Sequence, residues 1–268
     1  MSKYYMKILV KMAKQDGYNK KLLAFFIAFF LVITFLTIYG AEHYNGHDIT
    51  VELEQYCKVS SSDLIKNNSN TYVYYVTWNG SPAGNAGSWA IYTFLKENGY
   101  NMTNHFNTSE SMKNFEYNNT PGLIFNNSKY SVTYHGAKTV IVVPVYLYGE
   151  NLTNGTTVSS GLKILKTEVP EPIYQEIKIY TTEAIVGGLS IPSDNISSIP
   201  HINSVTLITG PAGAYIWNGY LINPTNFISQ NRTLSPTTVL KDTYNSSSPS
   251  FGISSAVQGL ETTIKDVD

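Results

Sequence analysis

A turn between an apolar stretch and a helical stretch places residues where a redox enzyme would carry its thiols. Residues 71–100 read TYVYYVTWNGSPAGNAGSWAIYTFLKENGY, and the apolar run ends at Trp78. Cysteines at the positions of Ser81 and Gly84 would form a Cys-x-x-Cys pair at a helix N-terminus, where the helix dipole lowers a thiol pKa. Serine has no accessible anion near neutral pH and glycine has no side chain. Dithiol chemistry at this turn is therefore excluded.

A serine nucleophile is the other chemistry that this turn could carry. It would need a neighbouring base and an oxyanion site. The candidate bases His105, His135 and His201 lie in unrelated segments, and no G-x-S-x-G elbow surrounds Ser81. The simpler interpretation is that Ser81 caps a helix with Pro82 in its first turn.

The remaining side chains predict no metal and no cofactor. His43 and His47 are four residues apart, but such a pair in a polar stretch beside a membrane is more often solvated than liganded. No glycine-rich phosphate loop is present. The single cysteine, Cys57, cannot form an internal disulfide. It is either an inert thiol or a cross-link between two copies.

Residues 22–40, LLAFFIAFFLVITFLTIYG, predict one transmembrane helix. They carry no charge and span roughly 28 Å as a helix, enough for a hydrocarbon core of about 30 Å. A cleaved signal peptide would have a shorter apolar stretch and small residues at a cleavage site. Neither Ile38 with Gly40 nor Tyr39 with Ala41 provides two small residues. We therefore favour an uncleaved signal anchor.

The charges that flank residues 22–40 predict the orientation. Residues 1–21 contain six lysines and one acid, Asp16, and form a cytoplasmic basic segment. Because these lysines directly adjoin the span, they do not indicate a nucleic-acid partner. Residues 41–268 then face outside, with 12 Lys and Arg against 18 Asp and Glu, a formal net charge of −6. The chain is predicted to be a single-pass protein of the cell membrane.

The pattern Asn-x-Ser/Thr occurs 11 times, always beyond residue 40, where composition predicts about five. This excess favours a glycosylated extracellular domain. Asn79 is a poor acceptor because Pro82 follows its sequon in a tight turn. The candidate glycosylation sites are Asn67, Asn101, Asn107, Asn118, Asn126, Asn151, Asn154, Asn195, Asn231 and Asn245.

The pattern of apolar residues divides the outer part into a stalk, residues 41–70, and a domain, residues 71–268. Strong strand signals are Tyr72 to Trp78 and the run TVIVVPVYLY at 139–148, in which Pro144 predicts a bulge or a sheet edge. Residues 101–119 are expected to form a loop. The other expected elements are helices at 86–98, 171–186, 235–244 and 253–267 and a hairpin with strands at 205–209 and 214–217.

Three motifs resemble a known family. TWNGSPAGNAGSWA, residues 77–90, is similar to the S-W-Q-G-C-P-Y-G-A-A-x-S-W-A segment of domain of unknown function family 929, proteins of Sulfolobus-type archaea. Residues 120–125, TPGLIF, and the stretch 199–219 resemble two further family segments more loosely. The chain departs from the family at Ser81, where the family has cysteine, and at Ala83, where it has tyrosine.

The resemblance and the order of elements together predict an α/β fold. It is a thioredoxin-like domain with a helical insertion, preceded by one transmembrane helix. In such folds a proline-led hairpin faces the active-site turn, so the bond between Ile199 and Pro200 is expected to be cis. A degenerate groove would then be lined by Trp78, Ser81, Pro82, Ala83, Gly84, Ile199 and Pro200.

Three functions remain open for such a domain. The leading hypothesis is a non-catalytic binding module for an envelope protein, a peptide or a second copy of the chain. The alternative is a hydrolase or another non-thiol enzyme on the same scaffold. The third is a structural component of the cell envelope.

Overall fold

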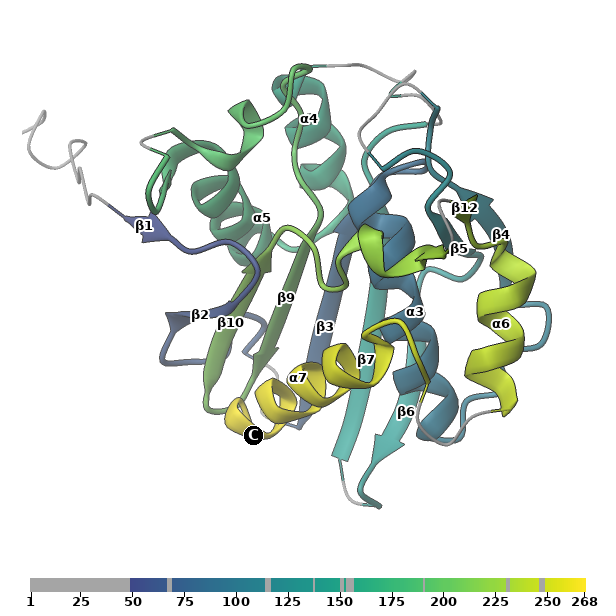
Figure 1. Cartoon of the computed structure of the whole chain (residues 1–268). Helices are drawn as coiled ribbons and strands as arrows, with labels where there is room; N and C mark the ends of the chain where they lie inside the picture. Colours follow the sequence, from purple (N-terminus) through teal and green to yellow (C-terminus); the bar gives the residue numbers. More distant parts are fainter. Residues whose placement is uncertain are drawn as a thin grey trace, which may run out of the picture. The chain divides into compact units, whose positions relative to one another are not determined.

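The longest strands of the chain lie at the centre of one mixed sheet, shown in the computed structural model of Figure 1. The structure describes residues 49–66, 69–113, 117–136, 138–149, 152, 157–189, 191–229, 232–245 and 249–268. Among these, no helix combines the length and the apolar character that a membrane crossing requires. The predicted anchor, residues 22–40, lies outside the described residues, as does the basic segment before it.

Six strands form the main sheet, in the order β2-β10-β9-β3-β7-β6. Their bounds are β2 Tyr56–Ser60, β3 Asn70–Thr77, β6 Tyr130–Tyr134, β7 Lys138–Tyr146, β9 Val205–Gly210 and β10 Gly213–Asn218. β3 pairs parallel with β7 and antiparallel with β9, and β9 pairs antiparallel with β10. The predicted hairpin is therefore confirmed as β9 and β10.

Three two-stranded ladders complete the strands. They are β1 Thr50–Val51 with β8 Ile185–Val186, β4 Phe106–Glu110 with β5 Pro121–Phe125, and β11 Ile228–Ser229 with β12 Arg232–Thr233. The expectation of a loop over 101–119 is wrong, because β4 occupies part of it. β4 reads FNTSE and exposes most of its length, so it carries no apolar signal of its own.

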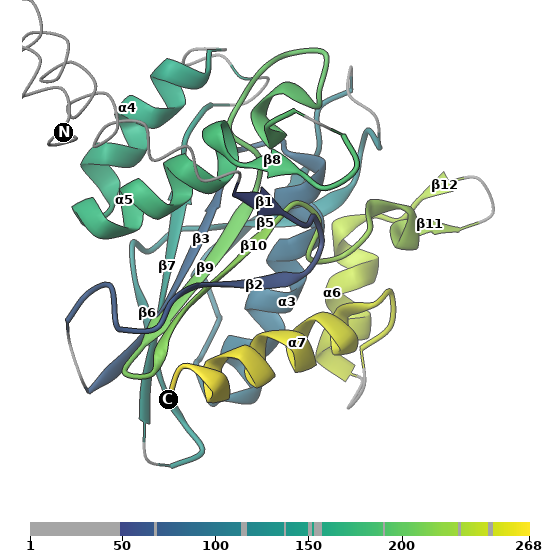
Figure 2. The same cartoon turned by 90° about the vertical axis from the view of Figure 1, so that its left-hand side faces the viewer.

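The helices cover both faces of the main sheet (Figure 2). They are α3 Pro82–Glu97, α4 Val158–Glu168, α5 Glu171–Lys178, α6 Pro236–Asn245 and α7 Ile253–Asp266, with shorter helical turns η2 Ile179–Glu183, η3 Ser193–Asn195 and η4 Pro224–Phe227. The predicted terminal helices are confirmed as α6 and α7. The predicted helix at 171–186 is observed as α5 followed by η2 and β8.

Side chains of β3 alternate between two apolar cores, as the period of a strand requires. Val73 and Tyr75 pack with α3 and α7 on one face. Tyr74 and Val76 pack with α4 and α5 on the other. A strand covered on both faces has to be apolar throughout, which explains the unbroken run in the sequence.

The stalk boundary at residue 71 needs correction. β1 and β2 both lie within residues 41–70, and β2 pairs with β10 at the edge of the main sheet. Cys57 belongs to β2 and is half-buried, with its Sγ 4.0 Å from the carbonyl oxygens of Glu52 and Gln55. The globular part therefore begins no later than Thr50.

Pro144 lies at a free edge of β7, one of the two positions predicted for it. The pairing of β6 with β7 extends from Lys138 only to Val142. The register between β7 and β3 continues through Pro144 without a bulge. The missing amide of the proline therefore costs no ladder hydrogen bond on that side.

Candidate functional site

The turn between β3 and α3 is built by helix-capping residues. Ser81 is the N-cap of α3, and its hydroxyl accepts a hydrogen bond from the amide of Gly84 at 3.1 Å. Pro82 occupies the first helical position, where a missing amide costs nothing. At the other end, Gly99 has φ +82° and its amide bonds the carbonyl of Lys96 at 3.0 Å. These local rules account for both ends of α3.

Three buried hydroxyl groups meet beneath this turn. The Oγ of Ser204 lies 2.7 Å from Oγ1 of Thr77 and 3.1 Å from Oγ of Ser81. Ser204 immediately precedes β9, so the cluster joins the start of β9 to the end of β3 and the start of α3. All three residues are buried. Because Ser81 also accepts from the amide of Gly84, its hydroxyl serves both a helix cap and this cluster.

Gly84 is required by packing. A Cβ at this position would lie 2.0 Å from Oγ1 and 2.9 Å from Cβ of Thr77, far inside contact distance. The hydroxyl of Tyr75 donates a hydrogen bond to the carbonyl of Gly84. Thus α3 approaches β3 closely at the residue where a Cys-x-x-Cys pair would have its second cysteine. A side chain of any kind there would displace the helix or Thr77.

A groove of about 430 Å³ opens beside the turn. Its wall combines the turn, the loop before β9 and the residues that follow β1 and β10. The lining residues are Leu53, Glu54, Trp78, Ser81, Pro82, Ala83, Ile196, Ser197, Ser198, Ile199, His201, Asn203, Ser204, Gly219 and Tyr220. Five residues of the predicted groove are among them: Trp78, Ser81, Pro82, Ala83 and Ile199. Gly84 lies behind the turn against Thr77, and Pro200 is outside the lining.

The expectation of a cis bond between Ile199 and Pro200 is wrong. No described peptide bond is cis. Ser204, four positions after the proline, is the residue before β9 that hydrogen-bonds Ser81 in the turn. The proline was the most visible marker in this stretch, whereas the serine carried no signal in the sequence.

His201 is a groove residue that the sequence could name only as an isolated candidate base. Its side chain is 5% exposed, and its ring stands edge-on to Trp78 with centroids 5.6 Å apart. Nδ1 lies 2.6 Å from the carbonyl oxygen of Ile199 and 3.1 Å from Oγ of Ser197. Burial lowers the pKa of His201, and the hydrogen bond to Ile199 opposes this shift. The neutral ring is thereby favoured inside the groove.

The groove is poor in charge. Glu54 is the charged residue among its lining, which includes no lysine or arginine. Nearby Asp194 is buried, which raises the pKa of its carboxyl group. Such a surface suits uncharged or apolar ligand groups with a few hydrogen bonds, and it offers nothing to phosphate. Across the described residues, no three His, Cys, Asp or Glu side chains come together in a metal-binding group.

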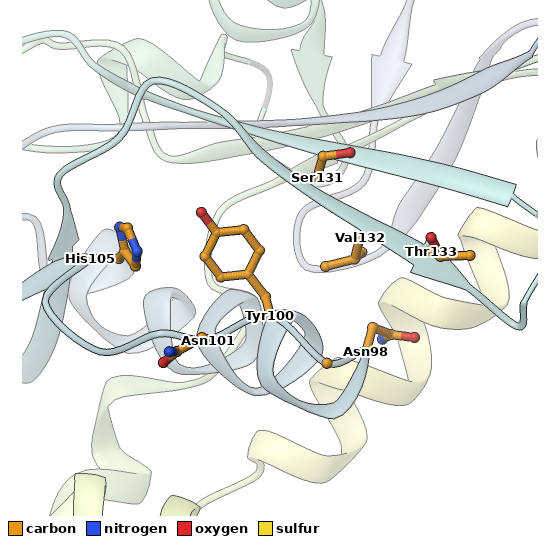
Figure 3. A pocket seen from close by; sticks show the side chains of 8 residues that line it. Asn98, Tyr100, Asn101, His105, Ser131, Val132 and Thr133 are labelled. Carbon is orange, nitrogen blue, oxygen red and sulfur yellow. The ribbon is translucent and has the colours of Figure 1, made fainter.

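A second hollow, of about 440 Å³, lies between the end of α3 and β6 (Figure 3). Its lining includes Tyr100, His105 and Val132. The imidazole Nδ1 of His105 is 2.9 Å from the side-chain Nδ2 of Asn127, and the His105 ring stands edge-on to the ring of Tyr100. These contacts tie His105 to the surrounding loop, and the hollow contains no predicted groove residue.

The candidate glycosylation sites that the structure describes are all exposed. They are Asn101, Asn107, Asn118, Asn126, Asn195 and Asn245. Asn79 is half-buried in the turn. The other candidates, Asn67, Asn151, Asn154 and Asn231, lie outside the described residues.

Two of the three motifs that carry the resemblance contact one another. The indole Nε1 of Trp89 donates to the carbonyl of Pro121 at 2.9 Å, and the side-chain Nδ2 of Asn85 donates to the carbonyl of Thr120 at 3.0 Å. Gly122 lies against Asn85, and a Cβ there would be 2.4 Å from it. These residues fasten β5 to α3 and so hold the helix that carries the turn.

Comparison with known proteins gives one match. The model of a family described as Domain of unknown function (DUF929) matches residues 55–266. No curated protein and no solved structure matches the chain.

Proposed function

The chain belongs to the family described as Domain of unknown function (DUF929), and from this premise we propose that it is a non-catalytic binding protein. The observation that carries the proposal is the groove of about 430 Å³ between the turn at Trp78–Pro82 and the loop before β9. The ligand that best fits this groove is an extended peptide segment with an apolar side chain. Trp78 and Ile199 would contact that side chain, and Ser198 and Asn203 would supply hydrogen-bonding groups.

We interpret the mixed α/β architecture as thioredoxin-like, and a fold of that type would support this role. β3 precedes α3 in the chain and β7 follows it, and these two strands pair parallel in one half of the sheet. In the other half, β9 and β10 pair antiparallel, and α7 follows them in the chain. The two halves meet where β3 pairs with β9, and α4 and α5 form the helical insertion between β7 and β9. In folds of this type the groove beside the first turn binds extended peptides. The trans bond before Pro200 and the serine at 204 distinguish this chain from that pattern.

The environment of the Ser81 hydroxyl favours binding over catalysis. The Ser81 hydroxyl already accepts from the Gly84 amide and contacts Ser204, which are the contacts of a helix cap. The chain has no second cysteine that could pair with Cys57. The groove therefore holds a ligand through shape and hydrogen bonds.

A serine hydrolase is the second candidate, because His201 and Ser81 line the same groove. A fluorophosphonate probe tests it directly, since the probe labels an activated serine covalently. We expect no labelling of the full chain. Labelling that disappears in Ser81→Ala and in His201→Gln would establish the hydrolase and contradict the binding proposal.

The binding proposal is tested by selecting peptides against the full chain. Ala83→Trp fills the groove from the first turn of α3, and Ser131→Trp makes a comparable change in the hollow of Figure 3. Peptides that bind the parent chain should lose at least about tenfold in affinity for Ala83→Trp, about 1.4 kcal/mol, and keep their affinity for Ser131→Trp. Failure to enrich peptides, or equal binding to both variants, would contradict the proposal.

We also propose that residues 22–40 anchor the chain in the cell membrane with residues 41–268 outside. The apolar run, the lysines before it and the sequons after it support this topology. The exposure of all six described candidate sites is what N-glycosylation requires. Mapping of glycopeptides from intact cells, together with protease accessibility, tests both points.

A further inference from the structure

Large exposed apolar side chains gather in one loop of the domain. Leu189 is 50% exposed, Ile191 39%, Ile196 40% and Ile199 37%, and all lie between β8 and β9. We refer to these four side chains as the apolar patch. Elsewhere in the described residues, Ile228 and Tyr244 are the other large apolar side chains of comparable exposure. The four lie within eleven consecutive residues of the chain, and exposed apolar residues that gather in one segment indicate a contact surface.

The apolar patch is attached to the first described residues of the chain. β8 pairs with β1, and the amide of Gly187 bonds the carbonyl of Val51 at 3.0 Å. The amides of Leu189 and Val186 then close the turn that leads to Ile191, through bonds to the carbonyls of Val186 and Ile191. Figure 2 shows β1 beside β8. The apolar patch thus begins where the chain enters the domain.

The distance from the predicted anchor to this point is short. Eight residues, 41–48, separate residues 22–40 from Ile49. Eight residues span at most about 30 Å when fully extended. In an anchored chain this tether sets an upper limit of about 30 Å on the distance between β1 and the membrane surface.

The loop is also nearly free of charge. Residues 187–201 contain no lysine or arginine and one acid, Asp194, which is buried. Charged side chains beside the loop include Glu52, which lies against Gly187, and Glu54 in the groove. A loop with few charges enters the headgroup region with little loss of ion hydration, and it gains by burying apolar area. Basic clusters, in contrast, bind membranes through anionic lipids and release them in salt.

We propose that the apolar patch lies on the outer surface of the membrane into which residues 22–40 insert, so that the partner of this loop is a lipid surface. The proposal rests on the membrane anchoring proposed above. Ile196 and Ile199 also line the groove. The groove then opens beside the bilayer, and its ligand is a segment of peptide close to the membrane surface.

The single cysteine of the chain makes a direct test possible. In full-length Cys57→Ser, the substitutions Leu189→Cys, Ile196→Cys and Ile228→Cys each introduce one attachment site for an environment-sensitive fluorophore. Ile228 is a matched control because it is 46% exposed and lies in β11, which pairs with β12. Figure 1 places β12 on the opposite side of the domain from β1.

Each labelled chain is reconstituted into vesicles that contain lipids carrying a nitroxide quencher. We expect blue-shifted emission and strong quenching at positions 189 and 196 and neither effect at 228. Raising the salt from about 0.1 M to about 1 M should leave the quenching unchanged, because no charge pair contributes to it.

Asn195 is a candidate glycosylation site directly before Ile196, so the lipid contact requires that this sequon carries no glycan. A glycan at Asn195 in the mapped glycopeptides, or one of the results below, would overturn the proposal. Quenching that is absent at 189 and 196, or equal at all three positions, rules out a specific lipid contact. Fluorophores shielded from water but not quenched by lipid would show that a peptide or a second copy covers the apolar patch. Co-sedimentation with the vesicles separates the two proposals. If the chain sediments but positions 189 and 196 are not quenched, only the lipid contact of the apolar patch is refuted. If the chain does not sediment, the membrane anchor is refuted as well.

Discussion

Replacing Gly84 with alanine tests whether packing explains the missing second cysteine. The new Cβ would lie 2.0 Å from Oγ1 of Thr77. Thr77 cannot retreat, because it ends the central strand and its carbonyl accepts from the amide of Leu147 at 2.8 Å. The clash would also separate Thr77 from Ser204, whose hydroxyls are 2.7 Å apart.

The size of the effect follows from three contributions. Forcing a methyl group into a packed site costs about 1–3 kcal/mol. Leaving a buried hydroxyl without its partner costs about 1–3 kcal/mol. Alanine gains up to about 1 kcal/mol over glycine within a helix. The free energy of unfolding of Gly84→Ala should therefore fall by about 3 kcal/mol, within a range of about 1–5 kcal/mol.

Urea unfolding of the full chain in mild detergent, followed by tryptophan fluorescence, measures this loss. Trp78 and Trp89 are both buried near α3 and report on its packing. Gly259→Ala, within α7, is the matched control, because a Cβ there meets only Cε2 of Tyr56, at 3.8 Å. This control should gain about 0.5–1 kcal/mol from helix propensity and reduced unfolded-state entropy.

A double-mutant cycle identifies the contact responsible. In a Thr77→Ala background, Gly84→Ala should cost at least about 1 kcal/mol less than in the parent chain, because the hydroxyl that it meets is gone. If Gly84→Ala were as harmless as Gly259→Ala, or cost the same in both backgrounds, the packing explanation would be refuted.

Three further predictions concern residues around the groove. Burial lowers the pKa of His201, so the unfolded chain binds the proton first and stability should fall as the pH drops below 6.5; His201→Gln should flatten this part of the urea-unfolding profile. Ser81→Ala should lose about 1 kcal/mol with its cap, and Ser81→Thr should lose less, as measured by thermal unfolding. Gly161→Ala should destabilise the chain by about 1–3 kcal/mol, because its Cβ would lie 2.0 Å from the Tyr148 hydroxyl, and Tyr148→Phe should recover part of this loss in the same assay.

Local signals were sufficient where neighbouring residues determine the structure. Ser81 as a cap with Pro82 in the first turn predicted the start of α3, because capping acts within a few residues, whereas the expected span of 86–98 began four residues too late. The unbroken apolar run at 72–78 predicted a strand, which is observed as β3. β4 was missed because its polar, exposed side chains give no periodic signal, and its pairing with β5, which follows across residues 111–120, leaves no pattern in the sequence.

The site was less predictable because it depends on contacts between distant residues. Ser204 contacts Ser81 although the two residues are 123 positions apart in the sequence, and no pattern around Ser204 predicts this contact. His201 was identified as a histidine, but its place beside Trp78 depends on how the loop before β9 folds. Pro200 was predicted to face the turn because a proline before a hairpin is easy to recognise in a sequence. The structure instead places the Ser204 hydroxyl in contact with Ser81.

These contacts bear on whether the turn is a redox site that lacks its cysteines. A cysteine at position 81 alone would have no partner, and one at 84 would collide with Thr77. Thr77 in turn contacts Ser204, which contacts Ser81, so a dithiol would require several buried residues to change together. The residues of the turn are coupled to one another through packing and hydrogen bonds. The turn is therefore organised to hold α3 against β3 and to form one wall of the groove, and this arrangement stands without a thiol at any of its positions.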